Sequence, residues 1–238
     1  MSTIGPFVPK PTFDLHIQRK LALAKALNAG ECGGDYLDAC LIVSALVNLI
    51  AADLWPGKGI DYFRFVETWV KYADPMLMPV KVSLPLLVRR LKKGGLLSEA
   101  QLVEALRPKA FGPGYASRVL YGDSDADEAE VLSACSSLTA EYVRRVTYPA
   151  IFYQHVRSPV VHEYHFGTRA AATPMTDQDE TVSYVNLTVL TSNGPASQRR
   201  IHFHLPWLAD VVTSIANQAY GDLAAGSLAE PAQWWTRG

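Results

Sequence analysis

Cysteine is scarce in this chain of 238 residues, and the positions of the cysteines argue against a fold held together by disulfide bonds or by a zinc ion. The three cysteines, Cys32, Cys40 and Cys135, are odd in number, and no two of them have the spacing of a zinc site. The sequence therefore indicates neither a disulfide framework nor a zinc knuckle. Cys40 and Cys135 lie in apolar runs, where we expect the buried thiols of a protein kept in a reducing cytoplasm.

An excess of charge and a long apolar run are also missing. Lysine and arginine number 22 against 23 aspartates and glutamates, which argues against a protein that coats nucleic acid through bulk charge. The longest uncharged apolar run, 39–52, is shorter than the roughly 20 residues that a membrane-spanning helix needs. The first residues lack the basic and apolar regions of a signal peptide. We therefore expect a cytoplasmic protein with no membrane partner.

The patterns that are present predict a mainly helical protein. Apolar residues make up 49% of the chain and charged residues 19%, which is a globular composition. Three caps are expected, Asp35, Asp61 and Ser98, because short polar side chains satisfy the first backbone N–H groups of a helix. The segment 107–127 is rich in proline and glycine and predicts a loop. Helical periodicity predicts helices over 13–29, 36–55, 61–73, 84–93, 98–106 and 127–146.

The last third of the chain changes character. Residues 181–191 are rich in β-branched side chains, and a turn signal at Ser192-Asn-Gly194 leads to a second alternating run. These features predict a β-hairpin at about 181–204, followed by a final helix over 207–220. We expect a single helical domain over 1–226 and a tail over 227–238.

An arginine and a histidine stand close together in the apolar, aromatic stretch 152–164. Pro149 can start a helix there, and Pro159 should end or kink it just after Arg157, because proline removes a backbone donor. Arg157 suits two phosphate oxygens and His162 suits proton transfer near neutral pH, so together they could cleave RNA without a metal. The same residues also allow a plainer interpretation, in which Arg157 interacts with a helix dipole and His162 fills a polar edge.

The string Arg157-Ser-Pro-Val-Val-His162, preceded by Tyr153 and followed by Glu163-Tyr164, resembles the Arg-x4–6-His motif of the HEPN superfamily. The resemblance implies a helical bundle of HEPN type that acts as a homodimer and as a metal-independent endoribonuclease. It implies His162 as general acid or base, Arg157 on the scissile phosphate, no cofactor and no metal. Ser158, Tyr153 and Tyr164 are the expected binding residues. The alternative is a non-catalytic HEPN-like module of a phage or defence system that binds RNA or a protein such as an antitoxin.

Two further groups of residues offer weaker signals. His202 and His204 are two apart in a predicted strand, so both could reach one metal ion as in a metal hydrolase, although an exposed polar face of the hairpin is the simpler expectation. The basic clusters could contact phosphates, with a solvated surface as the simpler expectation. These clusters are Arg89, Arg90, Lys92 and Lys93; Arg144 and Arg145; and Arg199 and Arg200.

Overall fold

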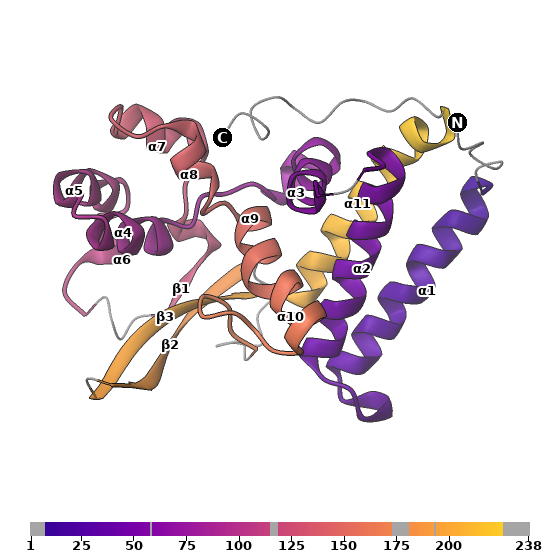
Figure 1. The fold of residues 1–238 in the computed structure, drawn as a ribbon, viewed down its shortest axis with the longest axis horizontal. Helices are drawn as coiled ribbons and strands as arrows, with labels where there is room; N and C mark the ends of the chain where they lie inside the picture. The colour runs from indigo at the N-terminus through magenta and orange to yellow at the C-terminus, as the bar shows by residue number, and fades with distance from the viewer. Residues whose placement is uncertain (1–7, 58, 115–118, 173–180, 193, 226–238) are drawn as a thin grey trace. The chain divides into compact units, whose positions relative to one another are not determined.

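The computed structural model describes residues 8–57, 59–114, 119–172, 181–192 and 194–225 (Figure 1). The described chain is mainly helical with a small antiparallel sheet near the C-terminus, which confirms the predicted fold class at this coarse level. The predicted tail, 227–238, lies outside the described residues. Internal contacts divide the chain into two compact units. Unit 1 is Met1–Pro79, Val160–His165 and Leu205–Gly238, and unit 2 is Val80–Pro159 and Phe166–His204.

Unit 1 is built from long helices. Figure 1 shows α1 (Lys10–Asn28), α2 (Tyr36–Leu54) and α11 (Leu205–Ala225) side by side, and α3 (Asp61–Tyr72) also contacts α2. The predicted start of α2 is confirmed: the Asp35 carboxylate accepts from the backbone N–H groups of Leu37 and Asp38, and the Asp38 side chain accepts from the N–H of Asp35. The predicted cap at Asp61 is wrong, because Asp61 lies inside α3 and Ile60 precedes it.

Helix α2 is the apolar centre of unit 1. Its fully buried residues include Val43, Val47 and Ile50, and it packs against α1, α3 and α11. At 19 residues the whole helix is longer than the uncharged run 39–52, so length and composition alone allow it to cross a membrane, and no other described helix passes that test. Half of it is buried within the protein, as in the core helix of a globular domain.

Unit 2 combines short helices with the sheet. Helix α4 (Leu84–Lys93) has its predicted bounds, α5 (Leu97–Leu106) begins after Leu96 and not at the predicted cap Ser98, and α6 (Pro108–Phe111) falls in the predicted loop. The single helix predicted over 127–146 is wrong. It divides into α7 (Glu128–Ala134) and α8 (Ala140–Arg144), because the hydroxyl of Thr139 accepts from the backbone N–H of Tyr142 and starts a new helix.

The sheet has the order β1-β2-β3. The predicted hairpin is confirmed as β2 (Val182–Thr191) and β3 (Gly194–Phe203), which pair antiparallel with Asn186 opposite Arg199. Gly194 has a φ of 96°, a conformation that glycine adopts without strain, and it allows the chain to reverse. Strand β1 (Leu120–Tyr121) pairs with β2 from inside the predicted loop, and two residues are too few to show strand periodicity in a sequence.

A buried carboxyl group holds the elements of unit 2 together. Asp125 accepts hydrogen bonds from the hydroxyls of Tyr148 on α9 (Tyr148–Phe152) and Tyr184 on β2, each at 2.6 Å, and from the backbone N–H of Leu84 at 2.9 Å. Burial raises the pKa of Asp125 to about 7, although these three donors favour its charged form. The start of α4 is thereby fixed to α9 and to the sheet.

Candidate functional site

The helix that carries the Arg157 motif does not break where the sequence predicts. Helix α9 continues through the π-helical turn η5 (Tyr153–Arg157) into α10 (Ser158–Glu163). Ser158 is helical, with φ −65° and ψ −51°, and its N–H bonds the carbonyl of Tyr153, five residues back. Pro159 leaves the His155 carbonyl without a helical donor, and the N–H of Gly167 supplies one at 2.8 Å. The predicted end of the helix after Arg157 is therefore wrong, because a wider π-helical turn and an outside donor accommodate the proline, and the predicted kink stays a prediction.

Arg157 and His162 have different surroundings. The Arg157 guanidinium lies over the ring of Tyr153, 5.0 Å from its centroid, and its Nη1 is 3.4 Å from the Tyr153 hydroxyl. His162 is exposed on α10. The boundary between the units falls between Pro159 and Val160, so Arg157 belongs to unit 2 and His162 to unit 1. The two residues therefore do not form one site within either unit.

Tyr164, an expected binding residue, holds a structural contact in unit 1. Its backbone has a positive φ of 52° just after α10, and its hydroxyl donates to Asp38 at 2.5 Å. This hydrogen bond raises the pKa of Tyr164. Asp38 also belongs to the capping box of α2, so Tyr164 ties the chain after α10 to the start of that helix. Ser158, the remaining expected binding residue, is only partly exposed.

The histidine pair of the hairpin is buried, so the expected exposed polar face is wrong. His202 Nδ1 donates to the carbonyl of Ala171 at 3.1 Å, and His204 Nε2 lies 3.0 Å from the hydroxyl of Ser183. Burial lowers the pKa of His202 to about 4. The half of the hairpin that lies away from its turn is buried on both faces. The alternating pattern of a strand alone does not reveal this. Among the described residues, no group of three or more histidine, cysteine or acidic side chains could hold a metal ion.

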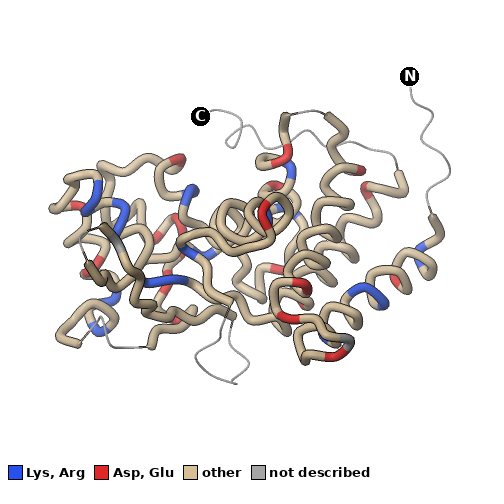
Figure 2. The backbone as a smooth tube through the Cα atoms, turned by 60° about the horizontal axis from the view of Figure 1, so that its bottom comes forward, with Lys and Arg blue, Asp and Glu red and all other residues tan. Residues whose placement is uncertain are grey.

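Unit 2 contains a cluster of arginines. The sequence alone predicts only an ordinary solvated surface for these residues. Basic and acidic positions are interspersed along most of the backbone (Figure 2), and folding brings the distant Arg169 to the basic run at 89–93. Arg89 and Arg90 lie on α4, and Arg169 lies far along the chain after α10. Partial burial lowers the pKa of Arg169, and the nearby guanidinium groups of Arg89 and Arg90 lower it further. We call these three residues the arginine cluster.

Backbone contacts hold Arg169 in place. The N–H of Ile201 on β3 donates to the Arg169 carbonyl at 2.8 Å, and the N–H of Ala171 donates to the Ile201 carbonyl at 2.9 Å. The same segment passes so close to η5 that a Cβ on Gly167 would lie 2.8 Å from Nδ1 of His155. Burial, and then the charge of Arg169, lower the pKa of His155 to about 4. We call residues 167–171 the Arg169 segment.

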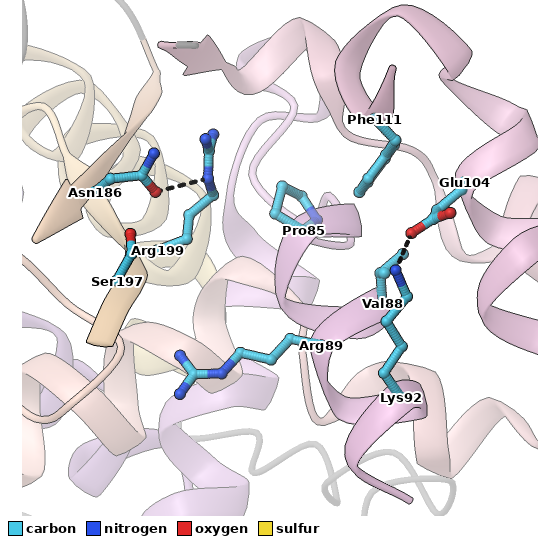
Figure 3. A pocket seen from close by; sticks show the side chains of 9 residues that line it. All are labelled: Pro85, Val88, Arg89, Lys92, Glu104, Phe111, Asn186, Ser197 and Arg199. Carbon is cyan, nitrogen blue, oxygen red and sulfur yellow. Dashed lines mark hydrogen bonds and ion pairs between the residues drawn. The ribbon is translucent and has the colours of Figure 1, made fainter. Parts of the chain in front are cut away.

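A cavity of about 460 Å³ is lined partly by Arg89 of the cluster (Figure 3). The hairpin contributes Arg199, only 7% exposed, whose Nε donates to the Asn186 carbonyl oxygen at 3.1 Å. Glu104 also lines the cavity but is held by Lys92 at 2.6 Å. Arg199 shares its strand face with the buried Ile201, a period-two signal that could have marked it as inward-facing. The lining residues are Pro85, Val88, Arg89, Lys92, Glu104, Phe111, Asn186, Ser197 and Arg199.

Comparison with family models, with curated proteins and with solved structures found no match to this chain.

Proposed function

We propose that unit 2 binds RNA through the arginine cluster. The supporting observation is that the three guanidinium groups lie close enough to lower the pKa of Arg169. Within the described part of the chain, none of the three forms an ion pair with a carboxylate. Grouping like charges costs free energy, and an anionic ligand offsets that cost.

The type of cation favours phosphate as the anion. A guanidinium presents a planar fork that bonds two phosphate oxygens at once, and it stays charged at any physiological pH. The chain as a whole carries a formal charge of −1, so the attraction is local to the cluster. The resemblance of the Arg157 motif to HEPN proteins favours RNA as the source of the phosphates.

Fluorescence anisotropy with labelled single-stranded RNA tests this proposal. We expect the double variant Arg89→Ala with Arg169→Ala to bind at least about tenfold more weakly, with a salt slope shallower by about two. The control is Arg19→Ala with Lys20→Ala, which removes two charges from exposed positions on α1. Equal RNA affinity of the two double variants would contradict the proposal.

A second proposal keeps the endoribonuclease that the motif predicts, with His162 as general acid or base and Arg157 on the scissile phosphate, in a homodimer. The exposure of His162 on α10 favours it, because a catalytic histidine must reach a phosphate from solvent.

Incubation of RNA with the protein and a chelator tests this second activity. We expect cleavage that is lost in His162→Ala and in Arg157→Ala and retained in His16→Ala, an exposed histidine on α1. Cleavage that survives both motif substitutions would remove the assignment. Loss of cleavage on chelation would do so too.

A further inference from the structure

The two outer edges of the hairpin are protected unequally. Strand β1 covers the outer side of β2 only at Ser183 and Tyr184, so the rest of β2 runs on past it (Figure 1). The outer side of β3 is covered at Ile201 by the Arg169 segment, and Pro195 lies further along it. Proline is one of the residues with which proteins block a sheet edge. The outer side of β2 contains no proline.

The register of the sheet determines which backbone groups of β2 point outward. Ile201 bonds the Arg169 segment with both its N–H and its carbonyl, so these groups point away from β2. In an antiparallel pair the bonded and non-bonded positions alternate, and Ile201 lies opposite Tyr184. Every second residue from Tyr184 towards the turn therefore directs its N–H and carbonyl away from β3. These residues are Asn186, Thr188 and Leu190, and within the described part of the chain they have no backbone hydrogen bond on that side.

The outer edge of β2 is also uncharged and partly apolar. No lysine, arginine, aspartate or glutamate occurs from position 181 to 198. Leu190 is 87% exposed and Leu187 is 38% exposed. Proteins usually keep an edge strand from pairing by placing charge, proline or a covering segment on it, and among the described residues this edge has none of the three beyond Tyr184. Such an edge is suited to pairing with another strand.

The sequence of this edge is complementary to itself. If two copies of β2 run antiparallel with Thr188 on a two-fold axis, Thr188 faces Thr188 and Asn186 faces Leu190, and each facing pair exchanges two backbone bonds. Leu187 then faces Val189 of the second copy at a non-bonded position, where the strands lie closest and apolar side chains make contact. No charge faces a like charge at any of these positions. A second copy therefore satisfies all the outward backbone groups at once.

We propose that two copies of this chain associate by pairing the outer edges of their β2 strands, which joins two three-stranded sheets into one. The interface is short, so the association is weak and reversible, as for the smallest interfaces between proteins. It differs from the homodimer that the motif at Arg157 and His162 predicts, because it is built from the hairpin alone. It also does not require RNA, so it stands or falls independently of the proposed function.

Sedimentation velocity with the full chain, after nuclease treatment, tests the pairing through two matched proline variants. Thr188→Pro removes an N–H that points to the second copy, and the two-fold axis doubles the loss, so we expect the dissociation constant to rise at least about tenfold. Ser197→Pro, opposite Thr188 on β3, removes an N–H that points to the other edge and should leave the association unchanged. Equal association of the two variants would overturn the proposal, and so would a wild type that stays monomeric up to about 0.5 mM.

Charge on the axis gives a second test that a folding defect cannot imitate. Thr188 is exposed and faces itself, so Thr188→Lys and Thr188→Glu each place like charges opposite one another, and each variant alone should associate at least about threefold more weakly at low salt. An equal mixture should associate more tightly than either variant alone, because opposite charges then face each other. A mixture no tighter than the single variants would contradict the proposal. A dimer that survives every Thr188 substitution but is lost in His162→Ala would replace it with the homodimer that the motif predicts.

Discussion

The two units differ in what they bury. Of the ten buried polar or charged residues in the described part of the chain, seven belong to unit 2 and three to unit 1. Unit 1 relies on apolar contacts between long helices, whereas unit 2 organises short helices and a sheet around Asp125, two histidines and Arg199. A buried polar group lowers the free energy of unfolding unless its hydrogen bonds are complete. A fully hydrogen-bonded polar network, in turn, fixes the arrangement of the side chains that form it. Unit 2 is therefore the unit in which we expect a binding site built from fixed polar groups.

The largest effect is expected from Asp125→Ala. The substitution leaves the hydroxyl of Tyr148 and the N–H of Leu84 without their buried acceptor and removes one of the two partners of the Tyr184 hydroxyl, so we expect a loss of about 3 to 5 kcal/mol in the free energy of unfolding. Urea denaturation followed by circular dichroism measures it. The control is Asp123→Ala, an exposed position whose removal should change stability by no more than about 0.5 kcal/mol. Similar losses in both variants would mean that the buried network does not hold unit 2 together.

A core substitution in unit 1 gives the apolar counterpart. Ile50 is fully buried in α2, and Ile50→Ala should cost about 3 kcal/mol through lost burial and the cavity left behind. Leu49→Ala, at the neighbouring position that is 45% exposed, should cost much less in the same denaturation experiment. A large loss at Leu49 would show that this face of α2 is covered in solution.

The pH dependence of stability should come mainly from unit 2. The folded pKa of His202 is about 4, below its usual 6.5, so the unfolded chain binds the proton more tightly and stability falls as the pH drops from about 6.5 towards 4. The loss from His202 is at most about 3 kcal/mol. Asp125 acts in the opposite direction, because its raised pKa makes the folded state gain a proton below about pH 7. Urea unfolding at several pH values measures this effect. In His202→Asn the free energy of unfolding should fall less steeply as the pH drops below about 6.5, and an unchanged slope would show that His202 is not the group responsible.

The smallest effects are expected from two glycines. Gly167→Ala places a Cβ 2.8 Å from His155 Nδ1 and should cost about 1 to 3 kcal/mol while displacing Arg169, so RNA affinity should fall as well. Gly221 in α11 has open space around it, and Gly221→Ala should stabilise unit 1 by up to about 1 kcal/mol. Thermal unfolding of both variants measures whether each substitution lowers or raises the stability of the protein. A stabilising Gly167→Ala would show that the segment can move away from η5.

Local signals in the sequence predicted much of the fold. The cap at Asp35, the bounds of α4 and the turn at Gly194 follow from backbone chemistry within a few residues, and the structure confirms them. The helix end predicted at Pro159 is wrong, because the donor that satisfies the His155 carbonyl comes from Gly167, which no local rule connects to it. Local signals do not predict strand β1 either, because its pairing partner β2 is about 60 residues away in the sequence.

The candidate site was less predictable than the fold. The sequence marks Arg89 and Arg199 as basic and predicts a solvated surface for both, and it carries no signal that singles out Arg169. Their convergence depends on strand pairing and on the Arg169 segment, so charge counts along the chain could not reveal it. The endoribonuclease, its homodimer and the protein partner remain predictions from the motif at Arg157 and His162.

The hydrogen bonds around Asp125 also have a consequence for folding kinetics. Tyr184 contacts Asp125 across 59 residues and Ser83 across 101, so long loops must close before either bond can form. We expect these two hydrogen bonds to form after the transition state for folding, because a hydroxyl can reach its exact geometry only once the surrounding core has packed. We therefore expect Tyr184→Phe to accelerate unfolding while leaving the folding rate nearly unchanged, which makes this tyrosine a determinant of how long the folded state of unit 2 persists.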